Sequence, residues 1–402
     1  MALLSNMNLA IPSPQAKALS QQLSDLIQQK IKNAGGWISF ADFMHMALYT
    51  PGLGYYSGGA QKFGMAGDFV TAPEISPLFA KTLALQAAQI LAATQGNILE
   101  LGAGTGKLVV DLLLELQQLK QLPEQYFILE VSDHLRQIQR ETCQTNLPAN
   151  LFEKIVWLDE LPPSPAAREG VRGFKGLILA NEVLDAVPAH ILHKTEDGFC
   201  EHGVGFEADF VWRDAALSDA KLAEHLSDDL PIGYMTEVNP AASALVRSLV
   251  EILETGVILM IDYGFGAAEY YHPQRNQGTL MCHYQHYAHD NPLINIGLQD
   301  ITAHVDFTQI AQVTNLKSSW QAHGIRLAGY VNQAQFLINC GILEVLAKTS
   351  PNDMATYAPL AAAAQKFLSP AEMGELFKAI AFSKNCDVLL IGFKSGDKSH
   401  TL

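Results

Sequence analysis

The residues of this sequence that could do chemistry begin with a glycine-rich turn. The stretch "NILELGAGTGKL" (97–108) passes from an apolar strand pattern through Gly102, Gly104 and Gly106 into a helical pattern. A turn of this kind lets the backbone approach a ligand and directs free N–H groups at it. Dinucleotide-binding turns usually carry GxGxxG, whereas Lys107 stands here at the third glycine position of that pattern. The turn therefore favours a nucleoside without a pyrophosphate over NAD or FAD.

Acidic residues lie near the ends of three successive strand patterns. Glu100, two residues before the first glycine, is expected at the mouth of the pocket, where a carboxylate suits a ligand that carries an amine. Glu130 follows the second pattern, at the spacing at which an acid accepts hydrogen bonds from ribose hydroxyls. Asp159 ends the third pattern and could accept from the exocyclic amine of adenine, or could be an ordinary loop residue.

These features together match S-adenosylmethionine (SAM), which carries an amine, a ribose, an adenine and a sulfonium cation but no phosphate. A dinucleotide and a structural turn without any ligand are the alternatives. The predicted cofactor-binding residues are Glu100, Gly102, Gly104, Gly106, Glu130, Asp159 and Asn181.

A second acidic motif, "ANEVLDAVP" (180–188), follows the fourth strand pattern. Glu182 and Asp185 are expected to emerge where the ligand crevice of a parallel sheet opens. A carboxylate at that place can bind a guanidinium through paired N–H···O bonds and is a candidate catalytic group in methyl transfer, which needs no metal. In the structural alternative, Glu182 ends the strand, Asp185 forms a turn, and Asn181 fixes the loop.

Three further residues are candidates for substrate binding. Glu237 adds another acid, although Asn239 followed by Pro240 also makes this segment a good helix start. Asp262 and Tyr263 end the strand pattern "GVILMIDYG", beside a glycine and facing the same crevice.

Three histidines in "MCHYQHYAHD", His283, His286 and His289, are spaced three residues apart. No cysteine or carboxylate pattern completes a tetrahedral set with them, so a lid on the acceptor side is favoured over a metal site. The segment 64–76, rich in glycine, could similarly fold over the bound cofactor and exclude water.

Composition limits the classes of partner and the compartment. The net charge of −15 repels phosphate backbones, which excludes general nucleic-acid binding and favours basic protein segments. The five cysteines form no CxxC pair, which fits a reducing compartment. The start of the sequence shows no signal or transit pattern, and no apolar run approaches the ~20 residues that span a bilayer. A cytoplasmic protein is predicted.

Strand and helix patterns alternate through much of the chain, which predicts an α/β fold with a mostly parallel sheet and helices on both faces. Strand patterns lie at 97–102, 126–131, 154–159, 176–181, 256–264 and 386–394. Helical patterns lie at 15–34, 39–49, 76–93, 107–120 and 133–144, and 306–380 is mostly helical in composition.

Seven motifs together resemble the MidA family of SAM-dependent methyltransferases, over about residues 36 to 394. They are "FADFMHMALYTPGLGYY", "GDFVTAPEISPLF", "ILELGAGTGKL", "ANEVLDAVP", "IDYGF", "GTLMCHY" and "DITAHVDF". The resemblance implies a class I SAM-methyltransferase fold (Rossmann-like) with an N-terminal helical extension and a helical insertion. It also places "DITAHVDF" near the acceptor channel, with Asp300 as a substrate-binding residue and His304 as a catalytic residue or a structural one.

The resemblance further implies a domain order and a substrate class. The expected segments are an N-terminal extension covering the active site (1–75), the SAM-binding core (76–305), a helical insertion on the acceptor side (306–380), and a final core strand with a mobile tail (381–402). Because the family includes a mitochondrial arginine methyltransferase of respiratory complex I assembly, the expected partner is a protein with an accessible arginine. Methylation of a small molecule or another side chain, and a non-catalytic SAM-binding assembly chaperone, are the alternatives. A homodimer is left open.

Overall fold

The structure is a computed structural model that describes residues 9–58, 71–164, 173–313 and 324–402. The chain forms two compact units. Unit 1 takes the described residues of Met1–Val70, Asp185–Ser243 and Ala268–His304, and unit 2 takes those of Thr71–Leu184, Ala244–Ala267 and Val305–Leu402. Each unit therefore combines segments far apart in the sequence, whereas the segments expected from the sequence were consecutive.

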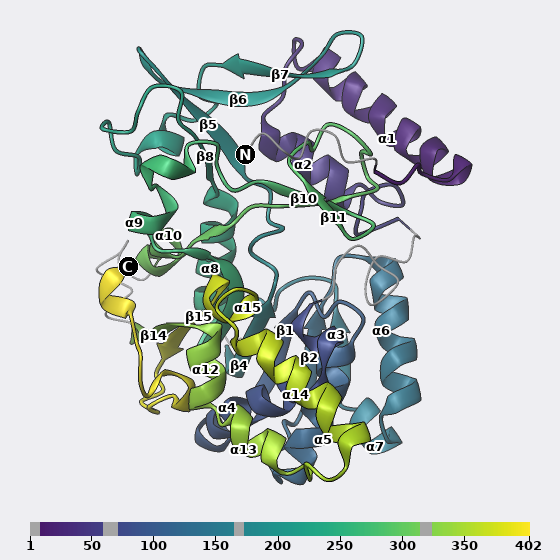
Figure 1. The fold of residues 1–402 in the computed structure, drawn as a ribbon, viewed down its shortest axis with the longest axis vertical. Helices are drawn as coiled ribbons and strands as arrows, with labels where there is room; N and C mark the ends of the chain where they lie inside the picture. The colour runs from purple at the N-terminus through teal and green to yellow at the C-terminus, as the bar shows by residue number, and fades with distance from the viewer. Residues whose placement is uncertain (1–8, 59–70, 165–172, 314–323) are drawn as a thin grey trace. The chain divides into compact units, whose positions relative to one another are not determined.

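Unit 2 contains a large, mostly parallel sheet with the strand order β14-β15-β9-β4-β1-β2-β3, and β13 pairs with the end of β9. Figure 1 labels β14, β15, β4, β1 and β2 of this sheet. Pairs among β3, β2, β1, β4 and β9 are parallel, while β15 runs antiparallel to both β9 and β14. The strands are β1 (Asn97–Leu101), β2 (Tyr126–Leu129), β3 (Ile155–Leu158), β4 (Phe174–Asn181), β9 (Leu253–Phe265), β13 (Val305–Asp306), β14 (Ile325–Asn332) and β15 (Phe377–Lys384). The predicted α/β fold is confirmed.

Helices connect these strands and pack beside the sheet. They are α3 (Ala72–Ile75), α4 (Pro77–Thr94), α5 (Lys107–Gln118), α6 (Asp133–Asn146), α7 (Ala149–Phe152), α8 (Pro240–Ile252), α10 (Phe307–Gln312), α12 (Gln333–Asn339), α13 (Ile342–Ala347), α14 (Met354–Leu368) and α15 (Met373–Leu376). The helices predicted at 76–93, 107–120 and 133–144 are α4, α5 and α6, with small differences at their ends.

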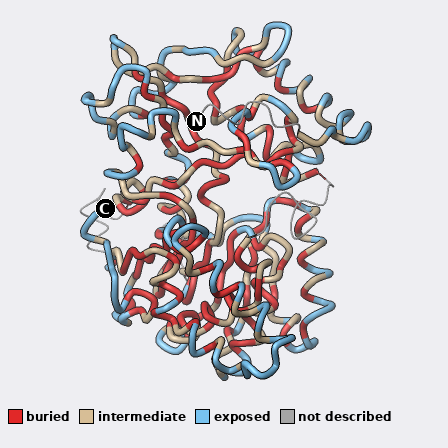
Figure 2. Tube along the Cα trace, viewed as in Figure 1, coloured by how far each residue is buried: buried red, intermediate tan, exposed pale blue. Residues whose placement is uncertain are grey.

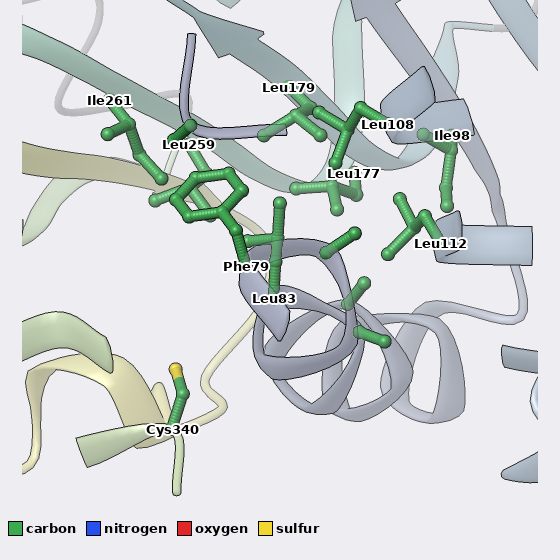
Figure 3. Packing of buried hydrophobic residues seen from close by; sticks show 14 of the residues in the cluster. Phe79, Leu83, Ile98, Leu108, Leu112, Leu177, Leu179, Leu259, Ile261 and Cys340 are labelled. Atoms are coloured by element: carbon green, nitrogen blue, oxygen red, sulfur yellow. The ribbon is translucent and has the colours of Figure 1, made fainter. Parts of the chain in front are cut away.

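The core of unit 2 lies where α4 and α5 pack on the sheet. Phe79 and Leu83 of α4 point toward Leu177 and Leu259, which lie on neighbouring strands (Figure 3). These side chains are fully buried, and each such burial contributes roughly 1.5–3 kcal/mol. Buried residues, red in Figure 2, run along the strands. This rigid sheet holds the carboxyl ends of β1, β2 and β4 in place.

The start of α4 shows how sequence signals fix an element. The Ser76 hydroxyl accepts a hydrogen bond from the N–H of Leu78 (3.2 Å), and Pro77 occupies the first helical position. A serine cap satisfies an otherwise unpaired helix N–H, and proline lacks the N–H that would be left over.

The strand predicted at 386–394 is wrong. These residues form an irregular segment with a short 3₁₀ turn, Ile391–Phe393. The N–H groups of Ile391 and Gly392 donate instead to the side-chain oxygens of Gln89 (3.1 Å) and Gln86 (2.9 Å) on α4. An apolar run whose backbone is satisfied by side chains needs no sheet partner.

The last strand of the sheet is β15, at Phe377–Lys384, and β14 precedes it at Ile325–Asn332. All of β14 and the first residues of β15 fall within 306–380, which the sequence analysis expected to be mostly helical. That stretch does contain α10 and α12 to α15, so it is a mixture of helices and strands. The two strands form the antiparallel edge of the sheet.

Unit 1 is built from helices and antiparallel sheets. One sheet has the order β7-β6-β5-β8 and a smaller one has the order β11-β10-β12. Leu23 and Ile27 of the first helix and Phe40 and Phe43 of the second are fully buried in its main core. The elements are α1 (Pro14–Asn33), α2 (Phe40–Tyr49), β5 (His190–Thr195), β6 (Gly198–Phe206), β7 (Phe210–Ala215), β8 (Met235–Val238), β10 (Met281–Tyr284), β11 (Tyr287–His289) and β12 (Asp300–Thr302), with α9 (Ala267–Tyr270) at its edge.

No helix in the described part of the chain is both long and apolar enough to cross a membrane.

Of the segment 64–76 expected to cover the cofactor, residues 64–70 lie outside the described residues. The rest of it includes α3, where Glu74 accepts a hydrogen bond from the hydroxyl of Thr105 in the glycine turn.

Candidate active site

The glycine turn joins β1 to α5 in unit 2. Gly102, Gly104 and Gly106 all have positive φ angles, of 62°, 53° and 84°, in the left-handed region that disfavours residues with a Cβ. Gly106 is the N-cap of α5, so the first N–H groups of that helix receive no hydrogen bond from a cap side chain. A Cβ on Gly106 would lie 3.2 Å from the Cα of Gln139, which shows how tightly α6 packs on the turn.

Glu100 lies inside unit 2 rather than at an open pocket mouth. Only 2% of it is exposed, and its Oε2 accepts a hydrogen bond from the hydroxyl of Tyr126 (2.6 Å) on the neighbouring strand. Burial raises the pKa of Glu100 to about 7, with a further increase from Glu130 and a partial offset from the Tyr126 hydrogen bond. A cation bound nearby would favour the ionised form of this carboxyl group.

Glu130 ends β2 as a buried carboxylate held at both oxygens. Its Oε1 accepts from the N–H of Ser132 (2.9 Å) and its Oε2 from the side-chain amide of Gln139 (2.9 Å). Burial raises the pKa of Glu130, although these hydrogen bonds act in the opposite direction. The carboxylate is therefore fixed in orientation by neutral donors.

Gln139 links three parts of the predicted cofactor site. Its amide nitrogen donates to the carbonyl of Gly104 (3.0 Å) as well as to Glu130, and its oxygen accepts from the indole N–H of Trp157 (3.0 Å). The residue is fully buried on α6. It therefore ties the glycine turn to the ends of β2 and β3.

Asp159 follows β3 and is exposed. Its carboxylate forms an ion pair with Arg136 (2.6 Å). The same guanidinium donates to the carbonyls of Glu130 (2.7 Å) and Leu158, and so connects the ends of β2 and β3. A contact of Asp159 with adenine stays a prediction.

Glu182 adopts a backbone conformation that is rare for a residue with a side chain. Its φ is +55°, although its N–H still donates to the carbonyl of Ile261 (2.9 Å) on β9. Its Oε1 accepts from the N–H of Ala72 (3.3 Å) and from the amide of Asn181 (3.1 Å). Unfavourable backbone geometry of this kind costs about 1–3 kcal/mol and concentrates at functional sites.

Asn181 offers a hydrogen-bond acceptor beside Glu182. Its Oδ1 is buried and has no hydrogen-bond partner among the described residues. Since a buried acceptor without a donor costs free energy, this atom suits a ligand N–H.

Asp262 has a structural role in the loop that follows β4, and its contact with substrate stays a prediction. It is buried at the end of β9, where its Oδ2 accepts from the N–H groups of Val183 (3.0 Å) and Leu184 (2.8 Å). It therefore holds the loop that follows Glu182. The neighbouring Tyr263 packs its ring against Phe377, with 5.4 Å between ring centroids.

Glu237 of unit 1 likewise supports the backbone. Its two oxygens accept from the N–H and hydroxyl of Thr279 and from the N–H of Leu280, at 2.9–3.1 Å. Thr279 in turn contacts His304, because its hydroxyl accepts from the His304 N–H (3.0 Å) and its carbonyl lies 3.3 Å from Nδ1 of the ring. Glu237 therefore positions His304.

The helix start predicted after Asn239 is confirmed, since the Oδ1 of Asn239 accepts a hydrogen bond from the N–H of Ala242 (2.9 Å).

Two further predicted residues are buried in unit 1. Asp300 accepts from the hydroxyl of Tyr56 (2.8 Å) and from the N–H of Ile301 (3.0 Å). The carbonyl of Asp185 accepts from the N–H of Ala303 (3.0 Å). Burial, reinforced by Asp300, raises the pKa of Tyr56 well above its ordinary value, so this hydroxyl stays a donor.

The three histidines of "MCHYQHYAHD" do not converge on one point. In the β10–β11 hairpin His289 lies opposite Cys282, and His283 lies opposite Ala288. Adjacent residues of a strand face opposite sides, so His283 and His289 point to different faces.

Sequence reasoning missed Tyr126, Gln139 and Thr279. A parallel register that pairs Ile98 with Tyr126 would have placed the tyrosine on the same face as Glu100, because Glu100 lies two residues after Ile98 on β1. Gln139 had no signal, because a glutamine in a helical pattern reads as a surface residue.

The sequence model of a family described as S-adenosyl-L-methionine-dependent methyltransferase matches residues 82–326. A structure of a Burkholderia thailandensis protein, described as a "likely methyl transferase" and bound to S-adenosyl-homocysteine, is 46% identical with a TM-score of 0.91, and the match covers 98% of this chain and 100% of that one. The mitochondrial "Protein arginine methyltransferase NDUFAF7" of Danio rerio is 29% identical over 378 residues, which is 86% of this chain and 83% of that protein. The human protein of the same name is 29% identical over 383 residues, covering 88% and 82%. The resemblance, the fold class and the SAM assignment made from the sequence are confirmed.

Proposed function

The chain belongs to the family of S-adenosyl-L-methionine-dependent methyltransferases, and from that premise we propose that it methylates an arginine side chain of a protein. The methyl donor is SAM, and the relatives named as protein arginine methyltransferases support the acceptor class. The observation that carries the proposal is Glu182, a carboxylate held at positive φ at the end of β4 beside the buried acceptor atom of Asn181.

The residues of unit 2 fit a cationic nucleoside. Glu100 and Glu130 are buried carboxyl groups with raised pKa values, and the hydrogen bonds that reach their oxygens come from neutral donors. Glu130 would hold the ribose, Glu100 would favour the positive charge, and the N–H groups at the start of α5 would face the ligand. SAM supplies an activated methyl group when it is bound.

Glu182 is the proposed ligand of the guanidinium. A carboxylate can bind two N–H groups of arginine and orient the third nitrogen for in-line attack. It would also localise positive charge away from the attacking nitrogen. Asp262 supports this role because it fixes the backbone of Val183 and Leu184, the residues that follow.

Two further residues keep, as proposals, the roles that the sequence analysis gave them. Asp185 is proposed as a second carboxylate for the acceptor, and His304 as a proton acceptor. If Nδ1 of His304 donates to the Thr279 carbonyl, Nε2 is the basic nitrogen. Because a guanidinium has a pKa above ~12, its proton is lost with or after methyl transfer.

The test is transfer of a labelled methyl group from SAM to proteins of a cell lysate, followed by mass spectrometry of the labelled residues. We expect methylarginine, a loss of about 10²–10³-fold in rate in Glu182→Gln, and S-adenosyl-homocysteine affinity close to that of the wild type. The exposed Glu160→Gln is the matched control and should keep full activity.

Three results would reject the proposal. Label on another side chain or on a small molecule would replace the acceptor class. No label, with a client protein still bound, would indicate an assembly chaperone. Full activity of Glu182→Gln would remove Glu182 from the mechanism.

A further inference from the structure

A cluster of metal-ligating side chains lies in the β7-β6-β5-β8 sheet of unit 1. His193 of β5 is paired with Cys200 of β6, and His202 of β6 is paired with Asp214 of β7. Residues directly opposite each other share a face of the sheet, as do residues two apart on one strand. The two histidines, the cysteine and the aspartate therefore all project from the same face.

The side chains of this cluster already converge. Asp214 lies between the histidines, with its Oδ2 2.9 Å from Nδ1 of His193 and its Oδ1 2.5 Å from Nδ1 of His202. The possible ligand atoms of His193, Cys200 and Asp214 all lie within 4.8 Å of one another. The cluster is only partly exposed, with 29% of the His193 side chain and 19% of the His202 side chain accessible.

We propose that His193, Cys200, His202 and Asp214 form a site for a divalent transition-metal ion of the zinc type. One thiolate, two imidazoles and one carboxylate make a complete tetrahedral set of the ligand types that Zn²⁺ prefers. The site draws on three strands of one sheet, and it stands apart from the proposed methyl transfer, which uses no metal.

The two His–Asp pairs require only small movements, whereas His202, which lies outside the set of atoms within 4.8 Å of one another, must also turn toward His193 and Cys200. Two Zn–N or Zn–O bonds of the usual length set tetrahedral ligand atoms ~3.3 Å apart, and a Zn–S bond widens this to ~3.6 Å. The His–Asp separations of 2.5 and 2.9 Å would open by under an ångström, and Cys200 would close in through rotation of its side chain. The ion would replace the protons that the histidines now share with Asp214, and the thiol proton would be released to solvent.

Trp212 provides an internal reporter of the site. It lies two residues before Asp214 on β7, and its ring stacks on His202 with 4.6 Å between centroids at 19°. A paramagnetic ion bound by His202 would therefore quench the fluorescence of this tryptophan.

The experiment uses the full chain after removal of metal with a chelator. Titration with Zn²⁺ should give one site per chain with a Kd of about 1 µM or tighter and should raise the melting temperature, because the ion binds the folded sheet. Co²⁺ in place of Zn²⁺ should give the absorption bands of tetrahedral cobalt together with a thiolate charge-transfer band. Cu²⁺ should quench the Trp212 fluorescence.

Variants identify the ligands. Cys200→Ser should abolish the charge-transfer band, and His193→Gln should weaken Zn²⁺ binding by ~10-fold or more. The exposed His225→Gln is the matched control and should bind as the wild type does. Circular dichroism and S-adenosyl-homocysteine binding check that each variant folds.

The proposal is overturned if the wild-type chain binds no Zn²⁺ at about 100 µM, well above the expected Kd. It is also overturned if bound cobalt shows no thiolate band, or if Cys200→Ser and His193→Gln bind as tightly as the control. The absorption spectrum of Co²⁺ bound to the wild type shows by itself whether a thiolate binds the ion. A variant that fails to fold therefore does not affect the test.

Discussion

Glu100 in unit 2 and Glu201 in unit 1 are both buried carboxyl groups on β strands, but their partners differ in the charge they can carry. Glu100 is bonded to the neutral hydroxyl of Tyr126, and burial raises its pKa to about 7. Burial also acts to raise the pKa of Glu201, but hydrogen bonds from His190 (2.6 Å) and Ser218 (2.8 Å) lower it below the ordinary value.

This difference in partners distinguishes Glu100, whose negative charge has no cationic hydrogen-bond partner, from Glu201, whose charge can be balanced by a histidine of the fold. In unit 1, Glu201 has a histidine as its partner and Asp214 has two. In unit 2, Glu100 and Glu130 accept from neutral groups, and a cationic ligand would complete them. Buried acids with neutral hydrogen-bond donors, at the carboxyl ends of parallel strands, are therefore the residues we propose for the cofactor site.

The largest expected effect is that Glu100→Gln stabilises the protein above pH 7, whereas Glu201→Gln destabilises it. The pKa of Glu100 is about 7 in the folded chain and 4.5 ordinarily, so the folded state holds more protons between these values. The free energy of unfolding should therefore fall by about 3 kcal/mol as pH rises from below 4.5 to above 7. Glu100→Gln, which keeps an acceptor for Tyr126, should remove this loss and stabilise the protein at pH 8, as measured by urea unfolding without ligand.

Glu201→Gln should have the reverse sign. Its folded pKa is lowered, so the ionised form stabilises the fold at neutral pH, and the substitution should cost about 1.5–3 kcal/mol there. The difference from the wild type should shrink as pH falls through the folded pKa of Glu201. If both substitutions shift stability in the same direction at pH 8, the comparison between the units is wrong.

A smaller effect is expected at Gln139, which connects the glycine turn, Glu130 and Trp157. Gln139→Glu removes two donated hydrogen bonds and places a second carboxylate against Glu130. We expect a loss of about 2 kcal/mol in SAM binding, or ~30-fold in Kd by calorimetry, with partial recovery at lower pH when the pair shares a proton. Gln144→Glu makes the same charge change at an exposed site of α6 and should bind normally. Equal affinities of the two variants would remove Gln139 from the site.

The smallest expected effect is the difference in stability between alanine substitutions at two glycines of the turn. Both Gly104→Ala and Gly106→Ala place a side chain at positive φ, at about 1–2 kcal/mol each. Only at Gly106 would the new Cβ approach Gln139, whereas at Gly104 no described atom lies within 4 Å. Thermal unfolding should show Gly106→Ala to be less stable than Gly104→Ala by about 1 kcal/mol. The reverse order would contradict the packing of α6 on the turn.

Local patterns were enough to predict the elements around the glycine turn. Strands β1, β2 and β3 alternate with α5 and α6 as expected, because a buried parallel strand and an amphipathic helix have distinct periodicities. The caps at Ser76 and Asn239 were also readable, since they depend on neighbours within three residues.

What the sequence could not reveal depended on distant contacts. The apolar run at 386–394 resembles a strand, and only Gln86 and Gln89, some 300 residues earlier, show why it is not one. Glu237 was a candidate for substrate binding, and only the contacts of its carboxylate with Thr279 and Leu280 show that it supports the backbone. Such pairings are set by tertiary packing and leave no periodic signal.

The central claim is that Glu100 is kept partly protonated until a cationic cofactor binds. Calorimetry of SAM binding in buffers of different ionisation enthalpy measures the protons exchanged. At pH 7 the wild type should release up to about 0.5 proton per SAM more than Glu100→Gln, and this difference should disappear at about pH 9, where Glu100 is already ionised. Identical proton counts for the two proteins at pH 7, or a larger uptake by the wild type, would contradict the account.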